Sequence, residues 1–519
     1  MSRRVARWVI AVVGGLLVLL AIIAGGGSRT ATLRQLVIET LSERLDSEVQ
    51  LESFSVDTFP TVHVTGTNLI IRHKGRKDVP PLVSVTAFEL DGGLFGLFSR
   101  PRRFRTVSLT GLQINIPPGF EKDGDSEAAP PVTATDQSDG AAAIVVDRLE
   151  ARGAALTLIP KRAGKEPRVF AVHSLTMKPL GRAETMSFEA TLTNPIPKGL
   201  IQTKGTFGPW HRDDPGATPL AGQYTFDKVL LSTIKGIGGN LASVGTFEGR
   251  LNRIGVKGTT HTPDFRVNVS ANPVPLDTRF EAVVDGTDGD TYLNTVEGTF
   301  LGTALACRGA IVGAEGVKGR TIQLHVKIDQ GRIEDVLRLG VKGDNPAMTG
   351  TLALHADMNL PAGPRDVMDR LHLAGTFQVN DARFTNAEIQ KKLSDLSERA
   401  RGLDPEEHAT HVASNFAGKF GLANNVLNLR EGAFNVPGAS VRVDGTYGLG
   451  SEVLQFDGTA RTKATLSQAA GGGMKSVMLK VVDPLFKRDG AGAVLPITIR
   501  GTRNDPKFGL DFGRVLKRQ

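Results

Sequence analysis

The stretch LAGTFQV at residues 373–379 decides the fold class, because its tripeptide GTF recurs along the chain. The other copies and close variants (GKF, GTY, GTA, GTR) stand at residues 205–207, 245–247, 298–300, 418–420, 445–447, 458–460 and 501–503. Their spacing is not constant, which argues against a solenoid with a fixed repeat length. Each copy lies in a segment of alternating apolar and polar residues, as expected of a half-buried strand. Because glycine permits a bend or bulge beside the aromatic residue, GTF predicts where a long twisted sheet curls.

The composition excludes several classes of protein. The chain has 519 residues, 60 of them glycine, and a formal net charge of +8. No basic run is longer than the pair Arg102–Arg103, so we expect no nucleic-acid partner, and a weak attraction to anionic lipid headgroups stays open. The single cysteine, Cys307, excludes both a disulfide-built fold and a multi-thiolate metal site.

The N-terminus predicts a membrane anchor. Residues 8–24 form an uncharged apolar run after three arginines, just long enough to cross a bilayer as a helix. The anchor prediction names Trp8, Val9, Leu16, Leu20 and Ala24. The positive-inside rule then places the N-terminus in the cytoplasm and the bulk of the chain outside it. The alternative is a cleaved signal peptide.

Beyond the anchor, the pattern changes from one short helix to many strands. Helical spacing over 31–47 predicts an amphipathic helix that packs on the core or rests on a lipid surface. Period-two alternation follows, with a phase slip at Gly111 that predicts a bulge. We count about 25–30 strands and further short helices at 226–239, 331–340, 386–402 and 471–490.

The expected organisation has five regions. They are the cytoplasmic N-terminus and anchor (1–27), a helix plus β segment (28–118), a flexible acidic loop (119–140), a central β region (141–370) and a C-terminal β region with capping helices (371–519). A sheet with one apolar face must bury it, and so few helices cannot cover it all. The pattern alone allows three arrangements: stacked sandwiches, closed barrels, or a folded trough lined by apolar side chains.

No pattern in the sequence indicates catalysis. His408 and His411 have the spacing of a metal pair, but no third ligand is indicated. The acidic stretch DGTDGD at 285–290 departs from calcium-loop spacing and predicts a hairpin turn. We find no P-loop, nucleophile elbow or dinucleotide motif, and Cys307 lies in an alternating apolar strand. We therefore expect no enzyme, no cofactor and no metal.

The chain resembles the AsmA-like family of bacterial envelope proteins. The stretches that carry the resemblance are LESFSVDTFPTVHVTGTNLII, ARFTNAEIQKKLSDLSERARG with the segment 413–449 that follows it, and VDPLFKRDGAGAVLPITIRGTRNDPKFGLD, together with residues 226–265. The resemblance implies an inner-membrane-anchored periplasmic protein, single-pass, similar to the bridge-like lipid-transfer group. It also implies an extended β-sheet curled like a taco around a hydrophobic groove, and a role in outer-membrane lipid homeostasis.

The expected function is the carriage of phospholipids along that groove, with the inner membrane and an outer-membrane or periplasmic protein as further partners. Each CH₂ kept from water contributes about 0.8 kcal/mol, and no nucleotide site is needed for flow along a gradient. The candidate lipid-binding residues are Val107, Leu109, Ile114, Ile116, Phe247, Phe300, Phe377, Phe420, Val441, Val443 and Tyr447. The alternative is a scaffold or assembly factor for outer-membrane proteins that pairs client strands with an exposed sheet edge.

Overall fold

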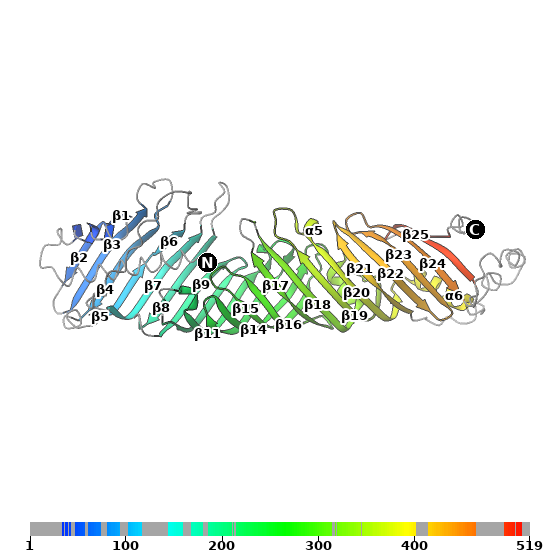
Figure 1. Ribbon diagram of the computed structural model, residues 1–519, viewed down its shortest axis with the longest axis horizontal. Coiled ribbons are helices and arrows are strands. Elements are labelled where there is room, and N and C mark those ends of the chain that lie inside the picture. The colour runs from blue at the N-terminus through cyan, green and yellow to red at the C-terminus, as the bar shows by residue number, and fades with distance from the viewer. Residues whose placement is uncertain are drawn as a thin grey trace, which may run out of the picture. The chain divides into compact units, whose positions relative to one another are not determined.

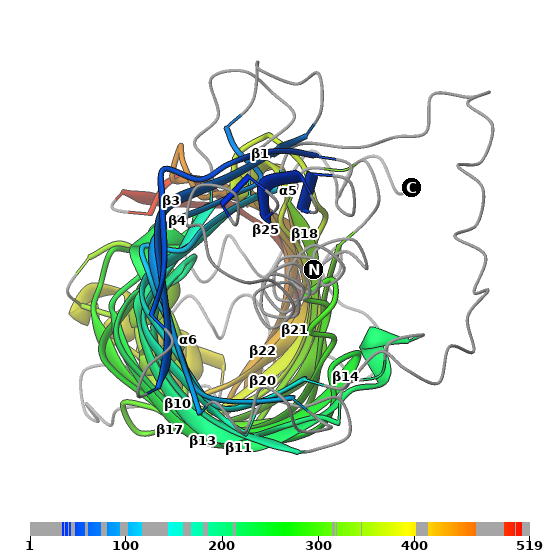
Figure 2. The ribbon, with the colours of Figure 1, turned by 90° about the vertical axis from the view of Figure 1, so that its left-hand side faces the viewer.

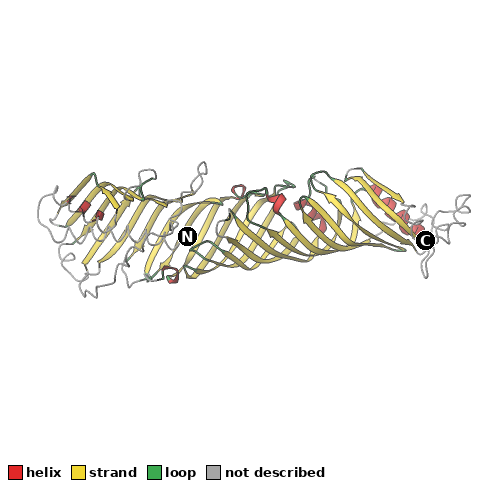
Figure 3. Cartoon of the chain, turned by 45° about the horizontal axis from the view of Figure 1, so that its top comes forward, coloured by secondary structure: helices red, strands yellow, loops and turns green. Residues whose placement is uncertain are grey.

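A computed structural model shows that the chain is a mainly β protein, with a large mixed sheet and a few short helices (Figure 1; Figure 3). The structure describes residues 34–35, 37–39, 41–42, 47–57, 61–73, 80–93, 102–116, 144–158, 168–179, 185–209, 211, 214–313, 317, 319–343, 345–400, 414–462, 493–503 and 505–510. Among these residues, no helix has the length and apolar composition needed to cross a membrane. The predicted anchor, the acidic loop 119–140 and the helix at 471–490 lie outside the described residues.

The chain divides into two compact units. Unit 1 contains residues 1–233, 241–258 and 283–289, and unit 2 contains residues 234–240, 259–282 and 290–519. The predicted region boundaries stay predictions, because they follow composition, whereas these units follow contacts between strands.

Strands β1 to β11 of unit 1 form a ladder that mostly follows chain order. Their bounds are β1 (Ser47–Gln50), β2 (Ser53–Asp57), β3 (Val62–His73), β4 (Val83–Gly92), β5 (Arg102–Thr110), β6 (Gln113–Ile116), β7 (Ile144–Leu158), β8 (Arg168–Lys178), β9 (Met186–Pro195), β10 (Lys198–Phe207) and β11 (Pro219–Leu230), with β13 (Asn240–Arg250) further along the chain. Both β1 and β2 pair with β3, and β5 and β6 pair with β7 in parallel. The two 3-10 turns are η1 (Pro215–Ala217) and η2 (Leu231–Thr233).

The first strands of unit 1 enclose a continuous core. Val37 and Leu41, in the short N-terminal helix, are fully buried against Phe88, Leu90 and their neighbours. The helix therefore packs on the sheet, which is the first of the two alternatives for residues 31–47. Alternation in β4 places its even-numbered and odd-numbered side chains on opposite faces until the burial pattern shifts near Ala87.

Unit 2 contains an antiparallel meander in which β16 to β26 pair in chain order. The strands and helices are β12 (Ile237–Gly238), β16 (Thr291–Phe300), β17 (Thr303–Gly313), β18 (Arg320–Arg332), α4 (Ile333–Gly340), β19 (Met348–Leu360), α5 (Val367–Arg370), β20 (His372–Phe384), α6 (Ala387–Ala400), β21 (Ser414–Ala423), β22 (Val426–Val436), β23 (Ala439–Gly448), β24 (Val453–Thr462), β25 (Ala493–Thr502) and β26 (Pro506–Leu510). Strands β14 (Arg253–Val267) and β15 (Val274–Val284) have residues in both units. The labelled strands β18, β20, β21 and β22 curve strongly along their length (Figure 2).

Of the short helices predicted after residue 47, two within the described residues are confirmed and one is wrong. Helices α4 and α6 match the predictions at 331–340 and 386–402. Glu334 and Asp335 in the first turn of α4, and Arg338 in its last, complement the helix dipole. Residues 226–239 are instead the end of β11, then η2 and β12. There Phe226 and its neighbours pair with β10, so strand hydrogen bonding overrides a short helical spacing.

Three of the four GTF glycines, Gly205, Gly245 and Gly375, lie at close approaches between strands, whereas a Cβ at Gly298 would meet no atom nearer than 3.4 Å. Gly375 has an extended backbone, and a Cβ there would overlap the His355 carbonyl and lie 2.8 Å from the ring of Phe420. Register shifts instead coincide with left-handed residues such as Asp381 and Glu431, both with φ of 53°. The register of β21 on β22 shifts between Ala417 and Lys419, at Gly418 of the GKF variant. The registers of β10, β16 and β20 have no shift at their GTF copies, so the bulge predicted beside the tripeptide is wrong at these three places. At Gly111 the backbone does break, with φ of 64° between β5 and β6.

Candidate functional site

A continuous apolar row crosses eleven strands of unit 2. The strand registers place directly opposite one another, in order, Val296, Cys307, Val326, Ala356, Gly375, Phe420, Leu429, Gly445, Phe456, Ile499 and Phe508. We call this set the central row. A second apolar row runs beside it, through Leu293, Gly309, Leu324, Met358, Leu373, Leu422, Leu427, Tyr447 and Leu454. Together they define the apolar face of unit 2.

Side chains of the central row are half-buried. Each of its members from Val296 to Ile499 is neither sealed nor fully exposed. At two places in the row a phenylalanine lies opposite a glycine, so that Phe420 fills the space above Gly375 and Phe456 that above Gly445. The GTF and GKF copies are reciprocal, because Phe377 in turn lies opposite Gly418. This arrangement makes a smooth apolar surface that retains contact with solvent.

Helix α4 covers the apolar face at one end of the strands. Val336 and Leu339 of this helix pack on a cluster formed by Val274, Phe300 and Ile328. The buried carboxylate of Asp335 accepts hydrogen bonds from the Gly302 N–H (3.0 Å) and the Thr303 hydroxyl (2.8 Å). These bonds hold α4 at the strand ends. The helix therefore does not cover the middle of the sheet.

A second covered area lies further along unit 2. Phe384, Phe416 and Phe434 pack as tilted or edge-on pairs with ring centroids 6.0 Å apart, and Phe377 meets Phe416 at 4.9 Å. Helix α6 is held nearby by the Ser397 hydroxyl, which donates to the Pro437 carbonyl at 2.7 Å. These aromatic residues therefore form a cluster in which Phe434 is buried and Phe377, Phe384 and Phe416 are half-buried.

The opposite face of the same strands is polar. One row on this face comprises Arg308, His325, Asp357, Ala374, Gly421, Asn428, Thr446, Gln455, Arg500 and Lys507. His325 and Asp357 pair across β18 and β19 at 2.5 Å, and Arg500 pairs with Asp457 at 2.8 Å. Since one face is charged and the other apolar, unit 2 is a strongly two-sided sheet.

A depression of about 720 Å³ lies mainly on this polar face. Its lining includes the polar residues His325, Asp357 and Arg430. Other lining residues are the small Ala374 and Gly421 and three members of the second apolar row, Met358, Leu373 and Leu422. Within the described part of the chain, no three metal-ligating side chains come together, there or elsewhere. The depression follows the curvature of the sheet and carries no arrangement typical of a reactive site.

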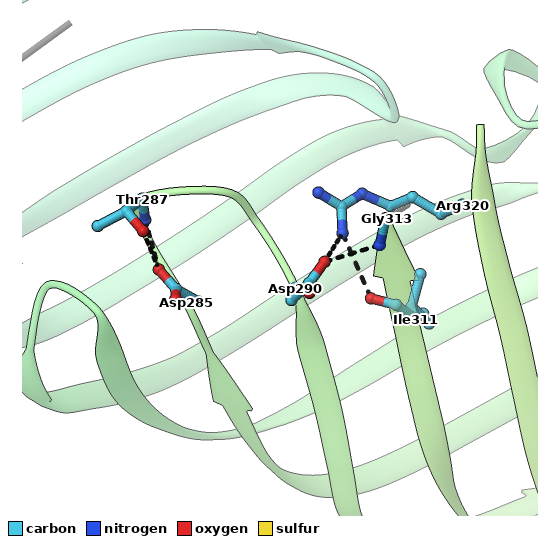
Figure 4. A network of polar contacts seen from close by, with 6 residues as sticks. All are labelled: Asp285, Thr287, Asp290, Ile311, Gly313 and Arg320. Carbon is cyan, nitrogen blue, oxygen red and sulfur yellow. Dashed lines mark hydrogen bonds and ion pairs between the residues drawn. The ribbon is translucent and has the colours of Figure 1, made fainter. Parts of the chain in front are cut away.

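The acidic stretch 285–290 is a hairpin turn whose carboxylates bind within the protein (Figure 4). Asp285 accepts hydrogen bonds from the backbone and hydroxyl of Thr287. In unit 2, Asp290 accepts the Gly313 N–H at 2.8 Å and Arg320 at 2.6 Å. The Gly313 bond, followed by the Arg320 bond and charge, lowers the pKa of Asp290. These bonds account for the acidic stretch as a structural feature, in agreement with the turn prediction.

The predicted lipid-binding residues fall into two groups. Val107, Leu109, Phe300 and Val443 are buried, and the first two belong to the sealed core of unit 1. The half-buried group comprises Ile114, Phe247, Phe377, Phe420, Val441 and Tyr447. Ile116 ends β6, and its side chain lies outside the described part. Only Phe420 is in the central row, and Tyr447 is in the row beside it.

Sequence reasoning missed most of the central row because it selected aromatic residues of the GTF type. The aliphatic members Val326, Leu429 and Ile499 stand in the same alternation, which was the available signal. Cys307 also belongs to the row, and burial raises the pKa of its thiol. Its placement agrees with the interpretation of Cys307 as a core or groove residue.

The remaining candidates lie outside the described residues. These are the pair His408 and His411 and the anchor residues Trp8, Val9, Leu16, Leu20 and Ala24. Comparison of the chain with protein-family models, with curated proteins and with solved structures finds no match. The feature of the described residues that bears most on function is therefore the two-sided sheet of unit 2.

Proposed function

We propose that the chain carries phospholipids, with their acyl chains lying on the apolar face of unit 2. The observation that supports this most is the half-exposed central row. At ~4.8 Å per strand, ten steps from Val296 to Phe508 extend over ~48 Å, longer than the ~30 Å hydrocarbon core of a bilayer. A surface of this length accommodates complete acyl chains.

The energetics favour an amphiphile over a purely polar ligand. Each CH₂ transferred from water to an apolar surface contributes about 0.8 kcal/mol, whereas the face offers few groups that could bind a sugar or a nucleotide. The polar face on the other side of the sheet keeps unit 2 soluble while the apolar face is occupied. Headgroups remain at the strand ends, in contact with water.

The setting that we propose is the bacterial envelope. On the sequence resemblance to AsmA-like proteins, residues 8–24 anchor the chain in the inner membrane and the β units lie in the periplasm. Movement of phospholipids toward the outer membrane is then the physiological role, and it requires no enzyme activity.

Photo-crosslinking in cells tests the proposal with the full chain. A photoreactive amino acid replaces Phe420 on the apolar face or, in the control, Lys419 on the polar face, whose ion pair with Glu431 is exposed. We expect phospholipid adducts, identified by mass spectrometry, at position 420 and at least tenfold fewer at position 419.

Two results would contradict the proposal. Equal adduct yields at the two positions would mean that lipid association does not depend on the apolar face. Capture of an outer-membrane protein at position 420, with no lipid, would instead support the scaffold or assembly role.

A further inference from the structure

The strands of unit 2 end on two rims. We call the one that carries the turn 301–302, α4, α6 and the turn 437–438 the α4 rim, and the opposite one, which carries α5 and the turns 424–425, 449–452 and 503–505, the α5 rim. Because neighbouring strands are antiparallel, the chain reaches the two rims alternately. A flat sheet would keep the rims a full strand length apart.

The turn that follows β14 belongs to the α4 rim. The Ser270 hydroxyl donates to the Leu339 carbonyl at 2.6 Å, and the Asn272 side chain donates to the Arg338 carbonyl at 2.8 Å. Gly236 joins this rim as well, because its carbonyl accepts the Asn268 N–H at 3.0 Å.

Two contacts nevertheless join the rims. Arg503, on the α5 rim, donates from Nη1 to the carbonyl of Lys342, just after α4, at 2.6 Å. Gly236, on the α4 rim, lies against α5, where an added Cβ would be 3.5 Å from the Cβ of Val367. The sheet of unit 2 is therefore curled until its strand ends meet along a seam.

The apolar face lies inside this curl. Val336 of α4 packs on the apolar face, and the residues directly after α4 reach Arg503 on the other rim. Arg503 also lies near Tyr447 of the apolar face: burial raises the pKa of this tyrosine, and the Arg503 charge opposes the rise. The seam thus closes the side of the apolar face.

The seam has few interactions compared with the strand ladders. Within the described part of unit 2, the two contacts use one side-chain hydrogen bond and one apolar contact at a glycine. Separating them breaks no strand pairing, whereas an opening anywhere else in the meander would break a complete ladder such as β19 with β20. Opening at the seam would therefore break fewer hydrogen bonds than opening a strand ladder.

We propose that this seam is a lateral gate through which phospholipids enter and leave the apolar face, with Arg503 and Val367 as its latch. The inference rests on the proposed lipid-carrying function and adds the route by which lipid reaches the apolar face. Sideways entry lets an acyl chain move onto the apolar face while its headgroup stays in the gap between the rims. Arg503, once released from the Lys342 carbonyl, provides a positive charge for a phosphate group there.

A disulfide across the seam tests the gate. In a Cys307→Ser background, Gly236→Cys with Val367→Cys places two Cβ atoms at a distance compatible with a disulfide. The full chain is incubated with phosphatidylethanolamine and phosphatidylglycerol vesicles that contain a fluorescent phosphatidylethanolamine, and lipid uptake is timed. We expect the oxidised form to take up lipid at least tenfold more slowly than the same protein after reduction.

Matched controls separate the effect of the disulfide from the effects of the single substitutions. Gly236 has φ of 97°, so the single variant Gly236→Cys measures the strain of a side chain there. Arg503→Lys keeps the charge but shortens the donor, and it should speed uptake several-fold by weakening the latch.

The outcomes distinguish the proposed entry route through the seam from the proposed lipid-carrying function. Equal uptake by the oxidised and reduced double variant would overturn the gate and leave lipid carriage in place, with entry from the ends of the sheet. Uptake by none of the forms, including the unsubstituted chain, would overturn both proposals.

Discussion

The first strands of unit 1 and the meander of unit 2 have the same alternating sequence pattern, yet they use it differently. In unit 1, Phe88 and Leu90 are 1% and 0% exposed under a cover that includes Val37 of the N-terminal helix. In unit 2, Phe420 and the other members of the central row from Val296 to Ile499 stay partly exposed, because α4 covers only one end of the strands. Alternation therefore identifies the apolar face, and the amount of covering structure decides whether that face is a core or a surface.

The largest expected effect is on the sealed core of unit 1. Phe88→Ala removes a ring that packs over Gly66, and large-to-small changes at buried aromatic positions cost about 3–5 kcal/mol of stability. Hydrogen exchange of the β3 and β4 amides measures the local free energy of opening. A loss no larger than that for Phe420→Ala would show that the two faces are equally covered.

Substitution of a glycine in the curled sheet of unit 2 should have the second-largest effect on stability. Gly375→Ala introduces a Cβ that overlaps the His355 carbonyl, and overpacking of this kind costs roughly 1–3 kcal/mol. Gly421→Ala is the matched control, because its Cβ would be at an ordinary 3.7 Å from the Leu373 carbonyl. Chemical denaturation of both variants should show a loss for the first only. Similar midpoints would mean that the curl does not depend on the GTF glycines.

Phe420→Ala should have a smaller effect on stability and a large one on lipid binding. The half-exposed ring buries less area than a core ring, so we expect a loss of about 1–2 kcal/mol. Mass spectrometry of copurified phospholipid should show a severalfold loss for Phe420→Asp. Unchanged lipid content in a folded Phe420→Asp variant would contradict the assignment of the central row as the binding surface.

The smallest effect concerns the polar face of unit 1. His63 bonds to Asp91 across β3 and β4 at 2.6 Å, and this hydrogen bond raises the pKa of His63 above 6.5. Because the folded-state pKa is raised, the pair stabilises fully below pH 6.5, and its contribution is lost as the pH rises through the raised value. NMR titration should show the His63 pKa falling in Asp91→Asn. An unchanged value would assign the shift to another group.

Some features of the site could be predicted from the sequence. The alternation in LAGTFQV set Phe377 and Gly375 on one face, and the spacing after Asn386 predicted α6 closely. Such features can be predicted from the local sequence, because the helix and strand periods appear in consecutive residues. The helix predicted over 226–239 failed for the converse reason, since pairing between β10 and β11 is a long-range property.

What the sequence alone determined is the β class and the two-sided character of the strands. Only the tertiary structure decided that Val107 and Leu109 are sealed while Phe420 and Leu429 share an open row. It also brought Arg503 to the Lys342 carbonyl, 161 residues away. The physical reason is that alternation fixes the direction of a side chain, whereas its exposure and its partners depend on register, curvature and the helices that happen to cover the sheet.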